Sequence, residues 1–470
     1  MTVQDKTVYE RVQYVYCRNG NMFMNCRAQK AATKTIPDAW ICLQKAEILK
    51  DRTRSNFSDI EIRCSNDLIF FEKRVGESIV GVATEVFEPG AFELWFLKTI
   101  LDNGDLSFSE RAPGKFKDLA VDFTKIFETT IRNSARVDRW EEGREAFIEN
   151  VQFFTSRQLP IEAVLPAFPC KTQNRDKAQE GKPDMGEELA LQRIIDFVQA
   201  VNSIYAPGMK FYIVSDGHVF SDCIGVDDNV VDTYTAQLIQ MYERMKPAGF
   251  DGICFKGLND CFKSTSKDII NAVLKDIDID HHLETMVDEE TDLNRKILMF
   301  GCDDNDNLLR EQIKTPGHSR LFLYRGFNKF MSEDLSQTDA AQKLSGKKFK
   351  KLISLVSYEM IRRNDAYSNL VELVFPFHLR FSIHAHPNSG PKFGIRLLDP
   401  EICTTGCHNQ DEEDRLLHIP TPWHNAVFKV SDAPKLIVSP AKLSQEYDND
   451  ETYTGGWDHK QRCFVYTRKN

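Results

Sequence analysis

Short runs of alternating apolar and polar residues mark the first hundred positions of the chain. The clearest are DIEIRC (59–64), DLIFFEK (67–73) and SIVGVATEVFE (78–88). A period of two is typical of strands that bury one face. The pattern predicts a β-rich N-terminal extension, which we place at residues 1–105.

From about residue 110 the apolar spacing changes to the helical period. Helices are predicted at 114–137, from Asp184 onward, and at 228–246. Apolar strand-like runs lie between and after them: KFYIVSDG (210–217), LRFSIHAH (379–386), FGIRLLD (393–399) and NAVFKV (425–430). Alternating strands and helices predict an α/β domain with a mostly parallel or mixed sheet covered by helices. We expect this domain at 106–430 and a tail that packs on it at 431–470.

Composition and charge narrow the class of protein. The chain has 470 residues and a net charge of −10, and a nucleic-acid binder would carry a basic footprint instead. No window approaches the eighteen apolar residues of a membrane span, and the N-terminus has no apolar leader. Twelve scattered cysteines suggest reduced thiols. We therefore expect a cytoplasmic protein that binds neither membrane nor nucleic acid.

The stretch FPCKTQNRDKAQEGKPDMGEELALQ (168–192) combines lysines with a helix start. Asp184 and Glu187 have the spacing of a capping box. A helix N-terminus beside Lys171 suits a phosphate group, because free N–H groups and cations both attract it. A solvated lysine loop is the alternative interpretation, and spacing alone does not exclude it.

The stretch VSDGHVFSD (214–222) follows an apolar strand and carries Ser215, Asp216 and His218. Acid–base groups of α/β enzymes often lie at the carboxyl ends of strands. An ordinary Asp-Gly turn would give the same local pattern.

The stretch FHLRFSIHAHP (377–387) alternates, so Arg380, Ser382 and His384 are predicted to share one strand face. A buried arginine needs an anionic partner, which indicates a ligand if that face is covered. A half-exposed edge strand remains the alternative.

Two further segments carry candidate binding residues. Trp423 and His424 precede a predicted strand and can either line a pocket or pack within a loop. Arg325 can clamp a carboxylate or phosphate, or pair with a surface acid.

A metal site is the less favoured interpretation of the histidines and cysteines. His384 and His386 are spaced as a ligand pair, and Cys403, Cys407 and His408 form another short cluster. A structural zinc site needs four ligands at compatible spacing, and a second cysteine pair is missing.

Taken together, five collinear segments resemble the pyoverdine/dityrosine biosynthesis family, which includes isocyanide synthases. The resemblance spans roughly residues 110–430, and the N-terminal hundred residues look like the extension seen on fungal members. The segments are LPAFPCKTQN…GKPDMGEELAL, VSDGHVFSDCIGV, YRGFNKF, MIRRNDAYSNLVELVFPFHLRFSIHAHP and TPWHNAVF.

This resemblance implies a Rossmann-like core and a reaction without metal or organic cofactor. In that reaction the α-amino group of an amino acid, valine or tyrosine here, condenses with the ketone of ribulose 5-phosphate. Fragmentation of the sugar leaves one carbon on nitrogen as an isocyanide, or as the N-formyl amino acid in the dityrosine branch. The chain resembles a stand-alone synthase in secondary metabolism, whose product a downstream tailoring enzyme can receive.

The resemblance also implies where the site residues lie. An arginine, Arg380 or Arg325, would hold the amino acid carboxylate, and the helix start near Lys171 would hold the phosphate. Groups that titrate near neutrality would serve the imine and elimination steps. The expected catalytic residues are Lys171, Asp216, His218, His384 and His424, and the expected substrate-binding residues are Asp184, Glu187, Ser215, Arg325, Arg380, Ser382 and Trp423.

Two competing functions stay open from the sequence. One is a metal-dependent oxygenase that uses His384, His386 and an acid. The other is a binding protein that has kept the pocket without catalysis.

Overall fold

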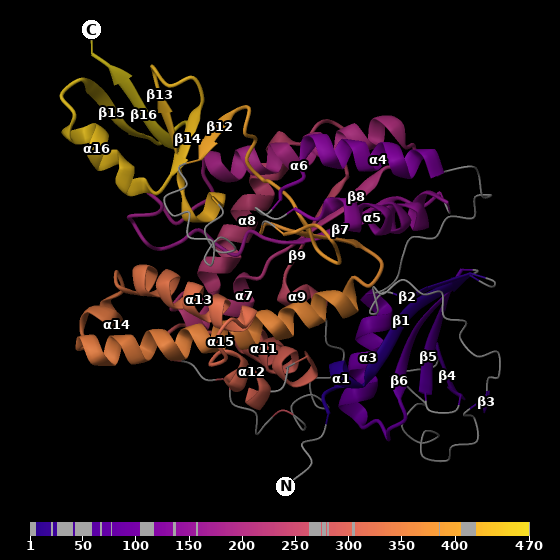
Figure 1. Cartoon of the computed structure of the whole chain (residues 1–470). Helices are drawn as coiled ribbons and strands as arrows, with labels where there is room; N and C mark the ends of the chain where they lie inside the picture. The colour runs from indigo at the N-terminus through magenta and orange to yellow at the C-terminus, as the bar shows by residue number, and fades with distance from the viewer. Residues whose placement is uncertain are drawn as a thin grey trace.

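Three β-sheets and the helices around them make up the part of the chain that the structure describes (Figure 1). The computed structural model describes residues 6–19, 22–25, 41–42, 59–65, 68–76, 78–103, 117–134, 138–156, 158–262, 274, 279, 282–302, 306–384, 386–405 and 420–469.

The central sheet contains five strands in the order β11-β10-β7-β8-β9, all parallel. Its strands read as apolar runs because helices cover both faces. This arrangement confirms the predicted α/β class. The strands are β7 (Ile161–Pro166), β8 (Met209–Val214), β9 (Ile253–Lys256), β10 (Leu379–Ser382) and β11 (Phe393–Gly394).

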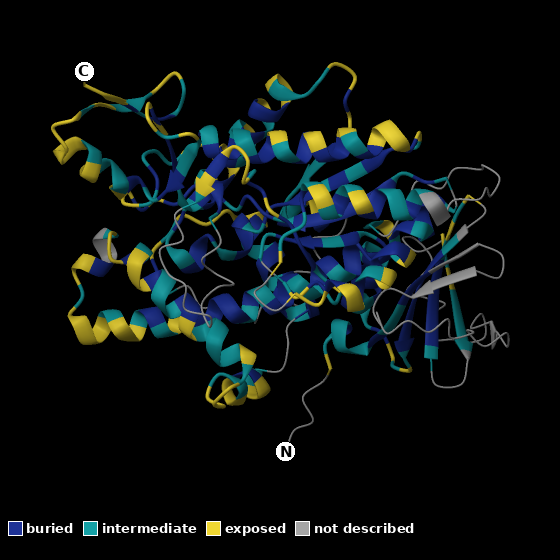
Figure 2. Cartoon of the chain, turned by 45° about the horizontal axis from the view of Figure 1, so that its top comes forward, coloured by how far each residue is buried: buried dark blue, intermediate teal, exposed yellow. Residues whose placement is uncertain are grey.

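Two groups of helices enclose the central sheet, and its strands lie buried between them (Figure 2). On one face Phe381 of β10 stacks on Phe127, with ring centroids 5.5 Å apart. On the other face Tyr367 donates a hydrogen bond to the Val214 carbonyl of β8. The first face is covered by α4 (Lys117–Thr130), α5 (Trp140–Thr155) and α6 (Met185–Ile204), and the second by α15 (Gly346–Val374).

The predicted strand over 379–386 ends early. β10 stops at Ser382, whose Oγ accepts a hydrogen bond from the His384 backbone N–H at 3.2 Å. His384 and His386 therefore lie in the loop that follows the strand. The run predicted at 393–399 also forms only a two-residue strand.

The N-terminal extension is a six-stranded antiparallel sheet, which confirms the β-rich prediction. The three alternating runs correspond to its strands β4, β5 and β6. Helix α3 (Ala91–Asn103) packs on one face of this sheet. The strands are β1 (Val12–Asn19), β2 (Met22–Asn25), β3 (Ile41–Cys42), β4 (Ile60–Ser65), β5 (Leu68–Val75) and β6 (Ser78–Glu85).

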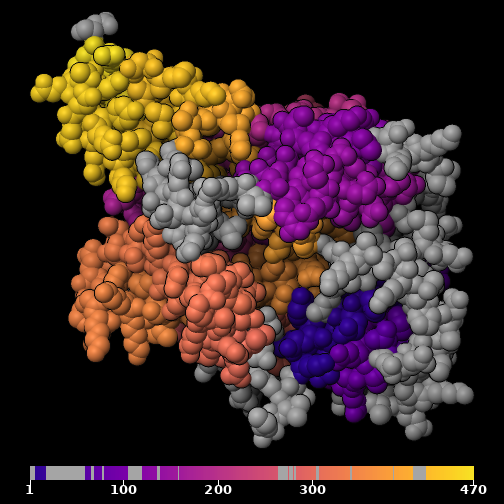
Figure 3. Space-filling model, in the orientation of Figure 1, coloured from indigo at the N-terminus to yellow at the C-terminus, as the bar shows by residue number. Residues whose placement is uncertain are grey.

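A third sheet forms near the C-terminus and appears as a yellow lobe in the space-filling view (Figure 3). β13, which precedes residue 430, pairs with β14 and β16, which follow it. The expected domain bounds remain predictions. The strands are β12 (Cys403–Thr405), β13 (Ala426–Val430), β14 (Leu436–Ser439), β15 (Tyr453–Asp458) and β16 (Cys463–Arg468).

Helix α13 (Ser319–Leu335) packs along α15 and forms an apolar cluster separate from the main core. Met331 and Leu335 of α13 meet Val356 and Met360 of α15 there. Among the described residues, no helix combines the length and apolarity needed to cross a membrane.

Candidate active site

A pocket opens at the carboxyl ends of β7, β8 and β10, between the central sheet and the α13–α15 helices. Pro166, Asp216 and His384 come from the strand ends or the loops after them. The opposite wall belongs to α13 and α15, and a short segment around Trp423 closes a further side. Its volume of about 200 Å³ holds roughly a dozen waters, so it admits a molecule the size of an amino acid.

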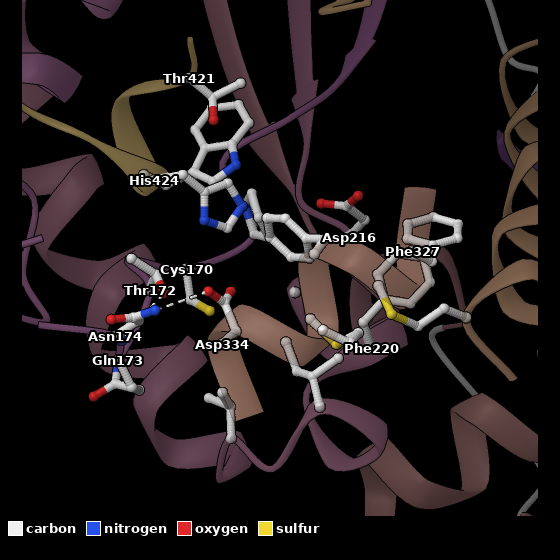
Figure 4. Close-up of a pocket in the computed structure, with 18 of the residues that line it drawn as sticks. Cys170, Thr172, Gln173, Asn174, Asp216, Phe220, Phe327, Asp334, Thr421 and His424 are labelled. Atoms are coloured by element: carbon white, nitrogen blue, oxygen red, sulfur yellow. Dashed lines mark hydrogen bonds between the residues drawn. The ribbon is translucent and has the colours of Figure 1, made fainter. Parts of the chain in front are cut away.

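Most of the pocket wall is apolar and aromatic. Phe220 and Phe327 lie around the hollow (Figure 4). Phe330, Met331 and Trp423 also line it. Trp423 is also held from behind by Phe168, with ring centroids 5.2 Å apart. Such a wall favours a ligand with a large apolar or aromatic group.

Asp216 is the buried acid of the pocket. It follows β8 and points toward the hollow (Figure 4). Burial raises the pKa of Asp216 to about 6. Its Oδ1 is buried, and no hydrogen-bond partner for it is found within the described ranges. A carboxyl group whose pKa is about 6 and which has one unpaired oxygen is suited to proton transfer.

Tight backbone packing fixes the position of Asp216. The neighbouring Ser215 hydroxyl donates to the Phe168 carbonyl at 3.1 Å and accepts from the Gly217 N–H. A Cβ on Gly217 would lie 2.2 Å from the Pro169 carbonyl oxygen, so the two strand-end loops approach this closely only because residue 217 is glycine.

Two buried arginines hold the turn that follows Asp216. Arg363 of α15 binds Asp222 through both of its terminal nitrogens, and Arg295 of α11 (Glu289–Cys302) binds Asp222 and Asp228. Arg295 also donates to the His218 carbonyl at 2.6 Å. Because these charges are paired and almost completely buried, the turn is tied to both helices.

His424 supplies a neutral imidazole to the pocket. Burial lowers its pKa well below the usual value, and Lys177 and Lys171 lower it further. Its ring meets Phe330 edge to face, with centroids 4.8 Å apart. A neutral imidazole can accept a proton or a hydrogen bond from a ligand.

One end of the pocket is polar. Asp334 of α13 accepts a hydrogen bond from Asn174 at 3.3 Å and pairs with Lys177 at 2.7 Å (Figure 4). The Lys177 ammonium also lies 4.2 Å from the centroid of the Phe330 ring. Thr172 and Thr338 add hydroxyl groups at the same end.

Lys171 does not face the pocket, so its expected role as a phosphate ligand is not supported by its position. Its ammonium is completely buried and lies 2.7 Å from Asp184, 2.9 Å from Glu187 and 2.7 Å from the Pro422 carbonyl oxygen. The carboxylates raise the pKa of Lys171 although burial opposes them, and burial raises that of Asp184 to about 8. The predicted capping box is present, and its side chains occupy the helix N–H groups. The cluster joins α6 to the Pro422 segment.

The remaining predicted residues fall into three positions. Arg325 is exposed on α13 and stands apart from the pocket, contrary to the expectation that it clamps a substrate. His218 is buried beside Asp232 of α8 (Asp228–Met245), 3.1 Å away, and does not line the pocket. Arg380 and Ser382 lie on β10 beneath the loop that carries His384.

The candidate metal ligands do not assemble within the described residues. His384 and His386 have ring centroids 6.4 Å apart. No group of three potential ligands among His, Cys, Asp and Glu is found in the described part of the chain. Cys403 lies in β12, whereas Cys407 and His408 are outside the described residues.

Several pocket residues have no local sequence signal. Asp334 lies on a helix more than a hundred residues from the β8 turn and outside the quoted segments, whereas Phe327 of the same helix belongs to the quoted segment YRGFNKF. Cys170 lines the pocket as a thiol, since burial raises its pKa to about 12. Asn364 also lines the pocket and lies in a quoted family segment, but an uncharged amide gives no reason to select it from the sequence.

Comparison with known families gives a match over residues 151–450 to the pyoverdine/dityrosine biosynthesis protein family. The chain belongs to this family. The match covers the central sheet, the pocket and most of the C-terminal sheet, and it confirms the resemblance found in the sequence. The family comprises biosynthetic enzymes that include isonitrile synthases.

Individual relatives refine this placement. The chain is 48% identical to the spore wall maturation protein DIT1 of Saccharomyces cerevisiae over 391 residues, which cover 81% of this chain and 72% of that protein. It is 27% identical to the L-tyrosine isonitrile synthase of Pseudomonas aeruginosa, over 64% of this chain and 79% of the relative. The crystal structure of the Pseudomonas aeruginosa PvcA protein matches with a TM-score of 0.57 at 24% identity, over 75% of this chain and all of that one. This structural likeness confirms the fold.

Proposed function

We propose that this chain transfers one carbon from ribulose 5-phosphate to the α-amino group of tyrosine and yields the N-formyl amino acid of the dityrosine branch. The observation that carries the proposal is the pocket itself, in which the loop after β8 presents Asp216 to a largely apolar and aromatic hollow. The reaction needs proton transfers near neutrality beside an apolar binding wall, and this pocket combines both.

The choice of tyrosine is supported by the wall and by the relatives. Phe220, Phe327 and Phe330 offer ring faces and edges to an aromatic side chain. Asp334 and Thr338 at the polar end can accept a hydrogen bond from a phenol. The spore wall maturation protein is the relative at 48% identity, and two relatives at 27% are L-tyrosine isonitrile synthases.

In this reaction Asp216 takes a proton from the ammonium group of the substrate, because only the neutral amine can attack a ketone. The pKa of about 6 leaves the carboxyl ionised at neutral pH and still able to return the proton later. His424, neutral at that pH because its pKa is strongly lowered, accepts a hydrogen bond that orients the substrate.

The test is incubation of the purified chain with tyrosine and uniformly ¹³C-labelled ribulose 5-phosphate, followed by mass spectrometry. We expect an N-formyl product that carries a single labelled carbon, formed about 10²–10⁴-fold more slowly by an Asp216→Asn variant. A Glu243→Gln variant, which alters an exposed acid of α8, should retain the activity. Absence of product with tyrosine and every other amino acid would refute the proposal and favour a binding protein.

An isocyanide product is the second candidate, because relatives at 24–29% identity carry the name isonitrile or isocyanide synthase. The isocyanide and the N-formyl product differ by one hydration step, so the same assay separates them by mass. In either case we propose that a downstream tailoring enzyme takes the product.

A further inference from the structure

Two cationic side chains, Arg380 and Lys392, lie beside the pocket, under the loop that carries His384. Arg380 and Lys392 directly precede Phe381 and Phe393, which are paired across the parallel strands β10 and β11. Because side chains alternate along a strand, this register places the arginine and the lysine side by side on one face of the sheet. That face is covered by α15, whose Ser368 hydroxyl accepts a hydrogen bond from the Lys392 ammonium at 2.9 Å.

The loop after β10 brings a histidine to the same place. A Cβ on Gly394 of β11 would lie 2.8 Å from the His384 carbonyl oxygen and 3.2 Å from the His386 backbone nitrogen. The loop therefore folds directly over β11, and residue 394 must be glycine for it to do so. Ser382 and Gly394 are paired, so His386 is held above the face that carries Arg380 and Lys392.

Arg380 and His386 are half-buried and make no hydrogen bond or ion pair to an acid among the described residues. No hydrogen bond or ion pair to Arg380 is found in the described part of the chain, and its Nε is buried without a partner. The Nε2 of His386 is likewise buried and unpaired with respect to the described residues. Two acids of α15 lie nearby: Asp365 is already bound to Arg320, and Glu372, whose charge raises the pKa values of Arg380 and Lys392, accepts a hydrogen bond from Tyr9 at 3.3 Å. Arg380 is half-buried and its Nε is buried without a partner, so an anion that reaches this side chain would supply the missing charge and hydrogen bond.

Burial and the charge of Arg380 both act on the ionisation of the cluster. Burial lowers the pKa of Lys392 to about 8, and Arg380 lowers it further, while Glu372 and Asp365 oppose this. Burial likewise lowers the pKa of Arg380 to about 10, with Tyr367, Glu372 and Tyr9 opposing. An arriving anion would relieve both effects.

We propose that Arg380, Lys392 and His386 bind the phosphate group of the sugar substrate, and that the amino acid carboxylate is held elsewhere in the pocket. This inference rests on the proposed function, because that function supplies the sugar phosphate. Two cations, a hydroxyl from Ser368 and a ring N–H match a dianion with several acceptor oxygens better than a carboxylate with one charge.

The position of the cluster suits a two-part substrate site. His384 lines the pocket and adjoins His386, and Asn364 of α15 lines it one turn before Ser368. Tyr367 connects the two regions, since both Asp216 and Arg380 influence its ionisation. A sugar anchored by its phosphate at the cluster can therefore extend its carbonyl end toward Asp216.

The first test measures binding without turnover. Ribulose 5-phosphate, inorganic phosphate and unphosphorylated ribulose are titrated into the chain by calorimetry, with ³¹P resonance as a second readout. We expect Arg380→Gln and Lys392→Gln each to weaken ribulose 5-phosphate binding about tenfold to hundredfold, as for hydrogen bonds between charged groups. Lys350→Gln, an exposed change on the same helix α15, serves as the matched control. Unchanged affinity in both cluster variants would overturn the inference.

The second test separates the site from the proposed reaction. In steady-state assays the two variants should raise KM for ribulose 5-phosphate and leave KM for tyrosine unchanged; a rise for tyrosine alone would assign the cluster to the carboxylate and overturn the inference. A chain that binds ribulose 5-phosphate through these residues but forms no product would refute the proposed function and keep the site. Product formation with wild-type KM values in both variants would refute the phosphate site and keep the proposed function. Circular dichroism confirms that each variant is folded, and Lys392→Arg should recover most of the binding.

Discussion

Replacing Lys171 with methionine tests whether the buried cluster is structural. Methionine fills a similar volume but removes the ammonium that lies 2.7 Å from Asp184, 2.9 Å from Glu187 and 2.7 Å from the Pro422 carbonyl oxygen. Two carboxyl groups that are completely or almost completely buried then face each other without a cation. Removing one partner of a buried ion pair typically costs about 3–5 kcal/mol, and we expect a loss of that size in the free energy of unfolding at neutral pH.

The loss should depend on pH in a defined direction. Without the lysine, burial and mutual repulsion raise the pKa values of both acids in the folded state above their unfolded values of about 4. A raised carboxyl pKa leaves stability intact below the unfolded value and removes it as the pH rises toward the folded value. The deficit of Lys171→Met should therefore be small near pH 4 and largest above neutrality.

Urea titrations of the wild type, Lys171→Met and the triple variant with Asp184→Asn and Glu187→Gln measure this effect. The triple variant keeps the volume of the cluster without its charges, so we expect it to recover much of the lost stability. A Lys171→Met chain that is as stable as the wild type but forms no product would refute the reasoning, because the lysine would then act on the substrate.

Three further outcomes follow from other parts of the site. Asp216→Asn should lower the rate about 10²–10⁴-fold, and the wild-type rate should rise as the pH passes about 6, where the carboxyl group ionises, with no such rise in the residual activity of the variant. Phe327→Ala should raise KM for tyrosine about tenfold to hundredfold through lost apolar contact, with KM for ribulose 5-phosphate unchanged in the same assay. Arg363→Leu leaves Asp222 without its bidentate partner and should lower the free energy of unfolding by about 3–5 kcal/mol; in the same urea titration the exposed Lys348→Ala should change it by less than about 0.5 kcal/mol.

The sequence predicts the fold class well because periodicity reports burial directly. The alternating runs at 59–88 become β4, β5 and β6, and the helix opened by Asp184 becomes α6 with its capping box. The predicted C-terminal end of β10 is wrong, because the strand ends at Ser382 although the sequence alternation continues. The Ser382 hydroxyl and the close packing over Gly394 turn the chain there.

The site is predicted only in part, because its residues meet through tertiary contacts. Asp216 and His424 stand out as titratable groups next to strands, and both reach the pocket. Lys171 stands out in the sequence in the same way. Whether its ammonium meets a phosphate or two carboxylates depends on a tertiary contact with the Pro422 carbonyl, 251 residues away. Lys392 has no pattern of its own, and only the register of β10 and β11 places it beside Arg380.

Two parts of the fold form the pocket, the central sheet and the α13–α15 helix pair, and each has its own apolar cluster. The strand ends of the central sheet carry Asp216, whereas α13 and α15 contribute Phe327, Met331 and Met360 from their own cluster. Substitutions on α13 can thus reshape the chamber for a different amino acid side chain without displacing the proton-transfer group. The side-chain wall on α13 and the proton-transfer group after β8 thus come from different elements, although Arg363 of α15 joins that helix to the turn after Asp216.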